Sequence, residues 1–344
     1  MRIGLIGLGR IGAFHARTLT ELESVTELVV TDANLALARS VAASVGAQVA
    51  ASPSEMFGTG LDGVVIAAAT PAHVELLTAA TDAGIPAFCE KPLAASAEGG
   101  RALAQRLAGS DVPVQIGYPR RFDAGFAAAR AAVRGGELGW LHTVRATTLD
   151  PTPPPQEYVA SSGGIFRDCA VHDFDAIRWV TGREVSQVVA VGSNRGDPFF
   201  SELRDVDTAS SLLTLDDGTI AVVSNSRYNP RGYDVRLELH GSADSIAAGL
   251  ENRLPLRSVE PGADFPAGRP HSFFMDRFAD AFRAELATFV AMVAGEAPSP
   301  CTLADALEAE LIAEACRVSW WERRPVTLEE VRRGTGLPSR EGSR

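Results

Sequence analysis

The first 32 residues constrain the fold more than any other part of the chain. An apolar run from Arg2 to Leu8 leads into the glycine pattern Gly7-Leu8-Gly9-Arg10-Ile11-Gly12. A helical pattern follows to about Leu22, and a second apolar run, Thr26 to Thr31, ends at Asp32. Strand, glycine turn, helix, strand and acid, in this order, predict a βαβ unit that binds a dinucleotide.

Each glycine of this unit, and the acid that ends it, has a physical task. Gly7 allows the tight turn out of the strand, Gly9 lets a pyrophosphate approach the backbone, and Gly12 lets the helix pack closely on the sheet. The N–H groups at the helix start, at Arg10 and Ile11, are expected to hold the phosphates. Asp32 lies where an acid accepts hydrogen bonds from the adenosine ribose, so NAD is favoured over NADP.

The bulk composition excludes several classes of protein. At 344 residues the chain is too long for one typical core, which indicates two domains. The net charge of −11 argues against nucleic acid or an anionic membrane as a partner. The first apolar segment is already the first strand, and no apolar stretch is long enough to span a bilayer. Four scattered cysteines fit a cytoplasmic protein and predict no metal site.

Strands and helices alternate over residues 1–118, as a doubly wound parallel sheet requires, and this range is the expected NAD-binding Rossmann domain. Residues 119–331 contain several strands without intervening helices, and they predict an α+β domain with a large, mostly antiparallel, open-faced sheet. This second domain is expected to bind substrate and to form a homo-oligomer, a dimer or tetramer, through the open face. The last helix is expected to pack back on the first domain, and the polar tail 332–344 to be disordered.

Two further strand ends of the first domain carry polar residues, and ligands of doubly wound sheets bind beyond the carboxyl ends of the strands. Thr70, Pro71 and His73 follow one buried strand, and Glu90 and Lys91 follow the next. We expect all of them near the nicotinamide end of the cofactor. Lys91 is suited to donate a hydrogen bond to a substrate hydroxyl and lower its pKa. The alternative is a solvated surface lysine.

A third group of candidates lies in the second domain. Spacings of four and three residues predict that Asp168, His172 and Asp175 share one helix face. A carboxylate beside an imidazole fixes its tautomer and raises its basicity, so His172 is a candidate general base for an alcohol proton. The alternative is an ordinary exposed helix face with an N-capping aspartate.

Several segments together resemble the Gfo/Idh/MocA oxidoreductases, and most closely the inositol dehydrogenases. They are GLGRIGAFHA at 7–16, ATPAH at 69–73, EKPL at 90–93, QIGYPRRFD at 115–123, GGIFRDCAVHDFD at 163–175 and GYDVRLELHG at 232–241. The resemblance covers residues 1–330. It implies a Rossmann domain, a C-terminal domain with an open sheet, NAD as cofactor and hydride transfer at a ring carbon of a polyol or sugar.

The resemblance also implies roles for single residues. Lys91 matches the catalytic lysine, and His172 matches the proton-accepting histidine with Asp168 as its partner. The positions that match substrate contacts are Arg121, Asp150, Asp175 and, more weakly, Tyr233. Three positions depart from the inositol dehydrogenase pattern. Thr148 and Asp150 stand where a common His-x-Asn-Pro has its histidine and asparagine, and Phe282 replaces a tyrosine. These changes are expected to alter which polyol fits.

The function expected from the sequence is therefore NAD-dependent oxidation of a ring hydroxyl of an inositol-type polyol or a sugar to a ketone. Two alternatives stay open. One is glycoside modification on the same fold with NAD as a recycled group. The other is a regulatory protein that senses NAD without turnover.

Overall fold

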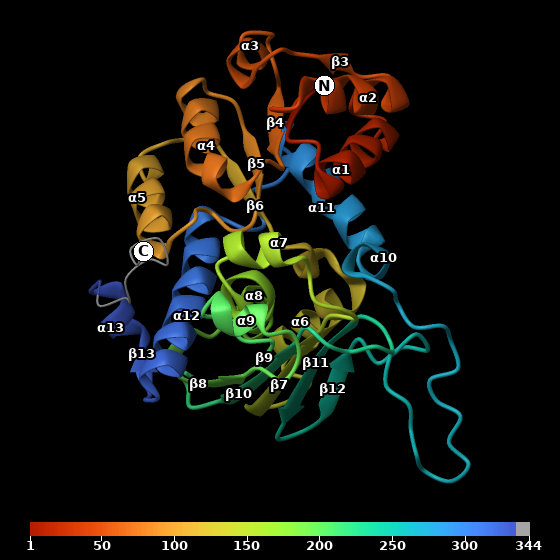
Figure 1. The fold of residues 1–344 in the computed structure, drawn as a ribbon, viewed down its shortest axis with the longest axis vertical. Coiled ribbons are helices and arrows are strands. Elements are labelled where there is room, and N and C mark those ends of the chain that lie inside the picture. Colours follow the sequence, from red (N-terminus) through yellow and green to blue (C-terminus); the bar gives the residue numbers. More distant parts are fainter. Residues whose placement is uncertain (335–344) are drawn as a thin grey trace. The chain divides into compact units, whose positions relative to one another are not determined.

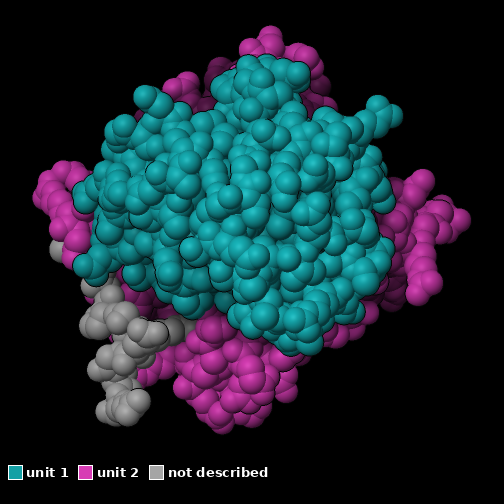
Figure 2. Space-filling model, turned by 90° about the horizontal axis from the view of Figure 1, so that it is seen from above, with its two compact units in different colours: residues 1–119, 280–307 teal, residues 120–279, 308–344 magenta. Residues whose placement is uncertain are grey.

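The computed structural model describes residues 1–334, and the remainder of the tail expected to be disordered, 335–344, lies outside the described residues. The chain forms two compact units, which Figure 2 distinguishes by colour. The first comprises residues 1–119 and 280–307. The second comprises residues 120–279 and the segment from residue 308 onward.

The first unit contains a six-stranded parallel sheet with the strand order β3-β2-β1-β4-β5-β6 (Figure 1). Its strands are β1 (Arg2–Ile6), β2 (Glu27–Thr31), β3 (Gln48–Val49), β4 (Gly63–Ile66), β5 (Ala87–Glu90) and β6 (Val114–Gly117). The connecting helices are α1 (Arg10–Glu21), α2 (Leu35–Val45), α3 (Pro53–Phe57), η1 (Thr70–Ala72), α4 (His73–Asp82) and α5 (Ala97–Leu107). This is the doubly wound Rossmann architecture that the alternating pattern predicts.

A helix from late in the chain completes the core of the first unit. The sequence pattern predicts one helix over 273–295, within the range expected for the second domain. The structure instead has two helices, α10 (Phe274–Arg277) and α11 (Ala279–Val293), separated at Phe278. Leu286 and Phe289 of α11 are fully buried in one cluster with Ile3 and Leu5 of β1. Periodicity identifies such an apolar face but does not specify which sheet it covers.

The second unit contains a seven-stranded sheet with the order β12-β11-β7-β10-β9-β8-β13. Its strands are β7 (Leu141–Leu149), β8 (Val185–Ser193), β9 (Thr208–Leu215), β10 (Ile220–Ser226), β11 (Asp234–Gly241), β12 (Ser245–Ala248) and β13 (Val326–Thr327). Every neighbouring pair is antiparallel except β7 and β10, which are parallel. The predicted fold class, a Rossmann domain with a mostly antiparallel second sheet, is confirmed.

The helices of the second unit are short except for three. They are η2 (Pro119–Phe122, which continues from the first unit), α6 (Ala124–Arg134), α7 (Gln156–Ser161), η3 (Phe166–Ala170), α8 (Val171–Thr181), α9 (Phe199–Glu202), α10, α12 (Leu303–Glu322, whose first turn belongs to the first unit) and α13 (Leu328–Arg332). α8 is buried along almost its whole length. Arg332, where the disordered tail was expected to begin, is the last residue of α13.

The two faces of the second sheet differ in exposure. Val188, Leu213 and Val223 point into the core and are fully buried. The alternate residues of the same strands point outward and are exposed apolar side chains, namely Val189, Val191, Leu212, Ile220 and Val222. An apolar sheet face that the described residues, 1–334, leave open is the arrangement that the sequence predicts. Among the described residues, no helix combines the length and apolar character needed to cross a membrane.

Candidate active site

The glycine turn after β1 has the shape of a dinucleotide cradle. Gly7 has φ +90°, and a Cβ there would lie 2.5 Å from the backbone of Ala68. A Cβ on Gly12 would lie 1.9 Å from the Gly7 carbonyl oxygen, so α1 packs against the turn only because both residues are glycine. A Cβ on Gly9, by contrast, would meet nothing within 4 Å. Gly9 therefore faces open space, as the approach of a pyrophosphate requires.

The start of α1 is prepared for an anion. Gly9 is the N-cap residue and has no side chain with which to cap the helix, and the first turn, beginning Arg10-Ile11, holds no acidic residue. The backbone N–H groups of this first turn and the positive end of the helix dipole favour a phosphate. The residues of the turn thus fit the cofactor that the sequence predicts.

Asp32 directly follows β2 and is fixed against the same turn. One carboxylate oxygen accepts a hydrogen bond from the Leu8 N–H at 2.7 Å, and the other accepts one from the Asn34 N–H at 2.7 Å. Each oxygen has a further lone pair that can accept a hydrogen bond from a ribose hydroxyl. The carboxylate is therefore oriented before any cofactor binds.

The segment that carries Lys91 is fixed at its start by a buried pair. Glu90, the last residue of β5, places its carboxylate 2.7 Å from Nε2 of His15, which belongs to α1 and is fully buried. The His15 ring also makes edge contacts with the rings of Phe88 and Phe282. The sequence indicated Glu90 as a cofactor contact, whereas its partner His15 was not singled out, because its position within an apolar helical pattern carries no separate signal.

The same segment is fixed at its end by His73, the first residue of α4. Its Nδ1 lies 2.7 Å from the Pro92 carbonyl oxygen, and its Nε2 lies 2.9 Å from the Ala68 carbonyl oxygen. A neutral imidazole donates to one of these carbonyls, and an imidazolium donates to both. His73 is buried, whereas Thr70 and Pro71 in the preceding η1 turn are accessible. The His73 ring thus joins the strand end after β4 to that after β5.

In the second unit, Asp168 and His172 lie on consecutive helical segments. Asp168 belongs to η3, a π-helical turn, and His172 is the second residue of α8. π-Turns within helices occur frequently at functional sites. The Asp168 carboxylate accepts hydrogen bonds from the Tyr158 hydroxyl and from Nη2 of Arg227, both at 2.8 Å. Asp168 and His172 are both partly accessible to solvent.

Arg121 and Asp175, two expected substrate ligands, are paired with each other. Nε of Arg121 lies 2.9 Å from one carboxylate oxygen of Asp175, and Nη2 lies 2.5 Å from the other. The side chains are 4% and 1% exposed. Such a bidentate, buried pair fixes η2 against α8.

A second buried cluster, which the sequence did not predict, lies beside the first. Asp173 pairs with Arg120, and it accepts hydrogen bonds from the Thr148 hydroxyl at 2.8 Å and from Nδ2 of Asn225 at 2.8 Å. Arg120 also donates to Thr148 at 2.8 Å. The adjacent arginines 120 and 121 and the two aspartates spaced two apart in α8 are the signal that could have indicated these two parallel pairs.

Tyr233 lies close to this cluster and is buried, with its ring edge-on to Phe278. Burial raises the pKa of its hydroxyl well above the usual value and the nearby Asp150 adds to this effect, although Arg120 opposes it. The Tyr233 hydroxyl therefore remains protonated and can donate a hydrogen bond. Its backbone N–H donates to the His271 carbonyl oxygen at 2.8 Å.

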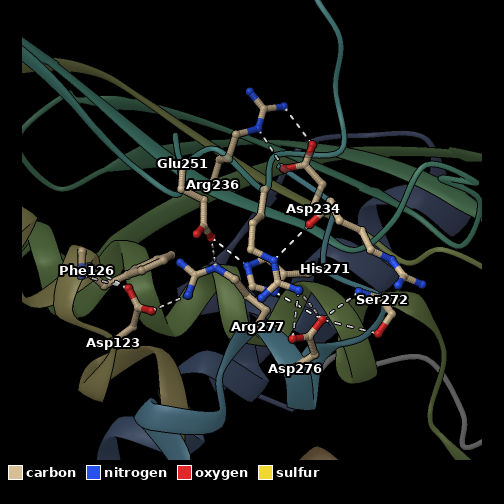
Figure 3. A network of polar contacts seen from close by, with 12 residues as sticks. Asp123, Phe126, Asp234, Arg236, Glu251, His271, Ser272, Asp276 and Arg277 are labelled. Atoms are coloured by element: carbon tan, nitrogen blue, oxygen red, sulfur yellow. Dashed lines mark hydrogen bonds and ion pairs between the residues drawn. The ribbon is translucent and has the colours of Figure 1, made fainter. Parts of the chain in front are cut away.

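His271, whose carbonyl oxygen accepts this bond, belongs to the polar network of Figure 3. Its Nε2 lies 3.0 Å from Glu251, and its Nδ1 lies 3.4 Å from Asp276. Arg277 of α10 lies 3.1 Å from the same Glu251 carboxylate. The irregular segment between β12 and α10 is thus tied to α10 through these side-chain pairs.

The comparisons with known proteins cover nearly the whole chain. Residues 1–118 match the model of an oxidoreductase family with an NAD-binding Rossmann fold, and residues 126–247 match that of the GFO/IDH/MocA C-terminal domain. The myo-inositol dehydrogenase Hyg17 of Streptomyces leeuwenhoekii is 39% identical, over 93% of this chain and 98% of its own length.

The chain belongs to the Gfo/Idh/MocA oxidoreductase family.

Solved structures of the family agree with this assignment. A probable dehydrogenase from Thermotoga maritima has a TM-score of 0.89 at 34% identity, covering 96% of this chain and 100% of its own. A scyllo-inositol dehydrogenase from Lactobacillus casei, solved with bound NAD(H) and scyllo-inositol, has a TM-score of 0.84 at 28% identity, covering 96% and 99%. The family resemblance predicted from the sequence and its NAD cofactor are confirmed. Among the described residues, no group of three His, Cys, Asp or Glu side chains could hold a metal ion.

Proposed function

We propose that this protein oxidises a ring hydroxyl of an inositol-type cyclic polyol, or of a sugar, to a ketone with NAD as cofactor. The observation that carries this proposal is the near full-length similarity to dehydrogenases of inositols. Lys91, Asp168 and His172, which stand in the EKPL and GGIFRDCAVHDFD segments, support it. NAD, when bound, supplies the hydride acceptor. The glycine turn and Asp32 would hold its phosphates and its adenosine ribose.

In this proposal the protein's own side chains handle the hydroxyl proton. Lys91 donates a hydrogen bond to the substrate oxygen and stabilises the negative charge that develops there. His172 takes the proton as general base. Asp168 holds the imidazole in the required tautomer and stabilises its charged form. Glu90 and His73 serve by fixing the two ends of the segment that carries Lys91, while Thr70 and Pro71 are the proposed neighbours of the nicotinamide.

Substrate recognition is proposed for the second unit, over the range 119–331. The protonated Tyr233 hydroxyl is suited to donate to a substrate hydroxyl. Arg121 and Asp175 are buried and bonded to each other, which favours a supporting role behind the pocket wall over direct contact. The exposed apolar face of the second sheet is proposed to bind further copies of this chain in a dimer or tetramer, and a cytoplasmic location is part of the same proposal.

The deciding experiment is an NADH-release screen over inositol isomers and common aldoses, with His172→Ala as the matched inactive variant. We expect stoichiometric NADH and ketone from at least one cyclic polyol, and none from the variant. Glycoside cleavage without net NADH would favour the glycoside-modifying alternative. Tight NAD binding without turnover of any compound would favour a regulatory role.

A further inference from the structure

Arg227 occupies a position that the parallel pairing of β7 and β10 creates. In that pairing Ser226 at the end of β10 is in register with Leu149 at the end of β7, so the next residues, Arg227 and Asp150, meet at one edge of the sheet. The Asp150 N–H donates to the Ser226 carbonyl at 2.8 Å. On its other side the Arg227 N–H donates to the Asp207 carbonyl at 2.8 Å. The backbone of Arg227 is therefore fixed from both sides.

The Arg227 guanidinium bridges two carboxylates. Nη1 donates to Asp150 at 2.7 Å, and Nη2 donates to Asp168 at 2.8 Å. The Arg227 side chain is only 4% exposed. The planar fork of arginine can bond two acids at fixed angles, which a lysine cannot do. Arg227 thereby links Asp168, the proposed partner of His172, to a rigid point of the sheet.

The charges around Arg227 keep its guanidinium protonated. Burial alone would lower its pKa, but Asp168 and Asp150 raise it well above its ordinary value. The neighbouring Cys169 is also buried, which raises the pKa of its thiol, so it stays neutral. Asp173 is compensated by Arg120, and the Tyr158 hydroxyl donates a hydrogen bond to Asp168. Burial raises the pKa of the Tyr233 hydroxyl, so this group adds no charge. Arg227 is thus a cation that two acids share at this edge, and it offsets one of their two negative charges.

We propose that Arg227 is a positioning residue of the dehydrogenase: it holds Asp168 in the orientation that supports His172, and Asp150 anchors Arg227. This rests on the proposed function, and it assigns Asp150 to the support of the acid–base pair. Without the guanidinium, Asp150 and Asp168 would leave an uncompensated negative charge. That charge would favour the imidazolium form of His172, so a higher pH would be needed before His172 could act as a base.

The test compares Arg227→Met with two variants that restore charge in different ways. In Arg227→Met, the acid limb of the kcat/KM profile should move to higher pH by about half a unit or more, with kcat lowered at least about tenfold. Arg227→Lys keeps the positive charge but not the planar fork. Its acid limb should therefore lie at the same pH as in the unmodified protein, while kcat stays low. Arg227→Met combined with Asp150→Asn removes one positive and one negative charge, so the net charge is that of the unmodified protein. Its acid limb should therefore also lie at the unmodified pH. Thermal melting and NAD binding verify that each variant is folded.

A readout independent of turnover separates this inference from the proposed function. The ring resonances of His172, assigned by their loss in His172→Ala, should show a titration midpoint at higher pH in Arg227→Met than in the unmodified protein. An unchanged midpoint, or a limb that moves equally in all three variants, would overturn the positioning role even if the enzyme is active. Absence of activity with a shifted midpoint would instead count against the proposed function alone.

Discussion

Lys91 is the residue whose loss should most directly stop the chemistry. Lys91→Met removes the charged donor but retains the length of the apolar stem. We expect kcat to fall at least about a hundredfold, because general acid–base and electrostatic contributions are of this size, while NAD binding stays nearly intact. Steady-state kinetics and NAD titration measure the two quantities separately. Unchanged turnover would remove Lys91 from the mechanism.

His73 offers a finer test at the same scale, because it acts on Lys91 only through the backbone. His73→Ala leaves the Pro92 and Ala68 carbonyls without their imidazole partner. A lost buried hydrogen bond costs about 1–3 kcal/mol, so we expect lower stability and a reduced kcat with little change in the affinity for NAD. A variant with native kcat would show that the segment holds its conformation without His73.

Asp32 is the residue that we expect to select NAD over NADP. Asp32→Ala should lower the affinity for NAD by about 10- to 100-fold, because it removes the acceptor expected for two ribose hydroxyls. The preference for NAD over NADP should become smaller. The ratio of kcat/KM for the two cofactors is the measurement. If the unmodified protein used both equally, Asp32 would not be the discriminating residue.

Among the elements, α10 should respond to acid. Asp276 of α10 lies in a partly exposed position whose slight burial raises its pKa, but the Ser272 N–H and Arg253 outweigh this, so the pKa falls below its ordinary 3.8. A lowered pKa in the folded state means that the carboxylate stabilises the fold above about pH 4 and that this contribution is lost as pH falls below it. Asp276→Asn should therefore reduce the steepness of acid unfolding.

Urea unfolding at several values between pH 7 and pH 3 measures this effect. The nearby Asp280→Asn is the matched control, because the Asp280 side chain is fully exposed and its ion-pair partner Arg283 lies on the same helix. If the free energy of unfolding fell with pH equally steeply in Asp276→Asn and Asp280→Asn, the role given to Asp276 would be contradicted.

Elements differ in how well the sequence predicts them, and the reason is the range of the interactions that fix them. The βαβ unit with Gly7, Gly9 and Asp32 is specified by local turn chemistry and period, and was predicted. β12 and β13 have four and two residues, too few to show a period. The same limit applies to the site. The Arg120–Asp173 pair joins positions 53 residues apart. The adjacent arginines and the two aspartates of α8 each form a local pattern, but neither pattern shows that the two segments meet.

At the scale of the whole molecule, the open face of the second sheet should control assembly. Leu212 is 45% exposed at the centre of β9, between Val189 and Val222 on the neighbouring strands. Leu212→Asp would place a charge in an apolar interface, and we expect light scattering to show smaller particles than for the unmodified protein. A monomer in the unmodified protein would end the assembly proposal.

The single parallel pairing in an otherwise antiparallel sheet has an evolutionary consequence. Had β10 run the other way, the residue after β7 would lie near the start of β10, roughly 20 Å from Arg227 at about 3.3 Å per residue. Positions 150 and 227 are adjacent only through that pairing, although 77 residues separate them in the chain. Among descendants of a common ancestor, these two positions should therefore mutate as a couple, an acid at one being retained where a guanidinium is retained at the other.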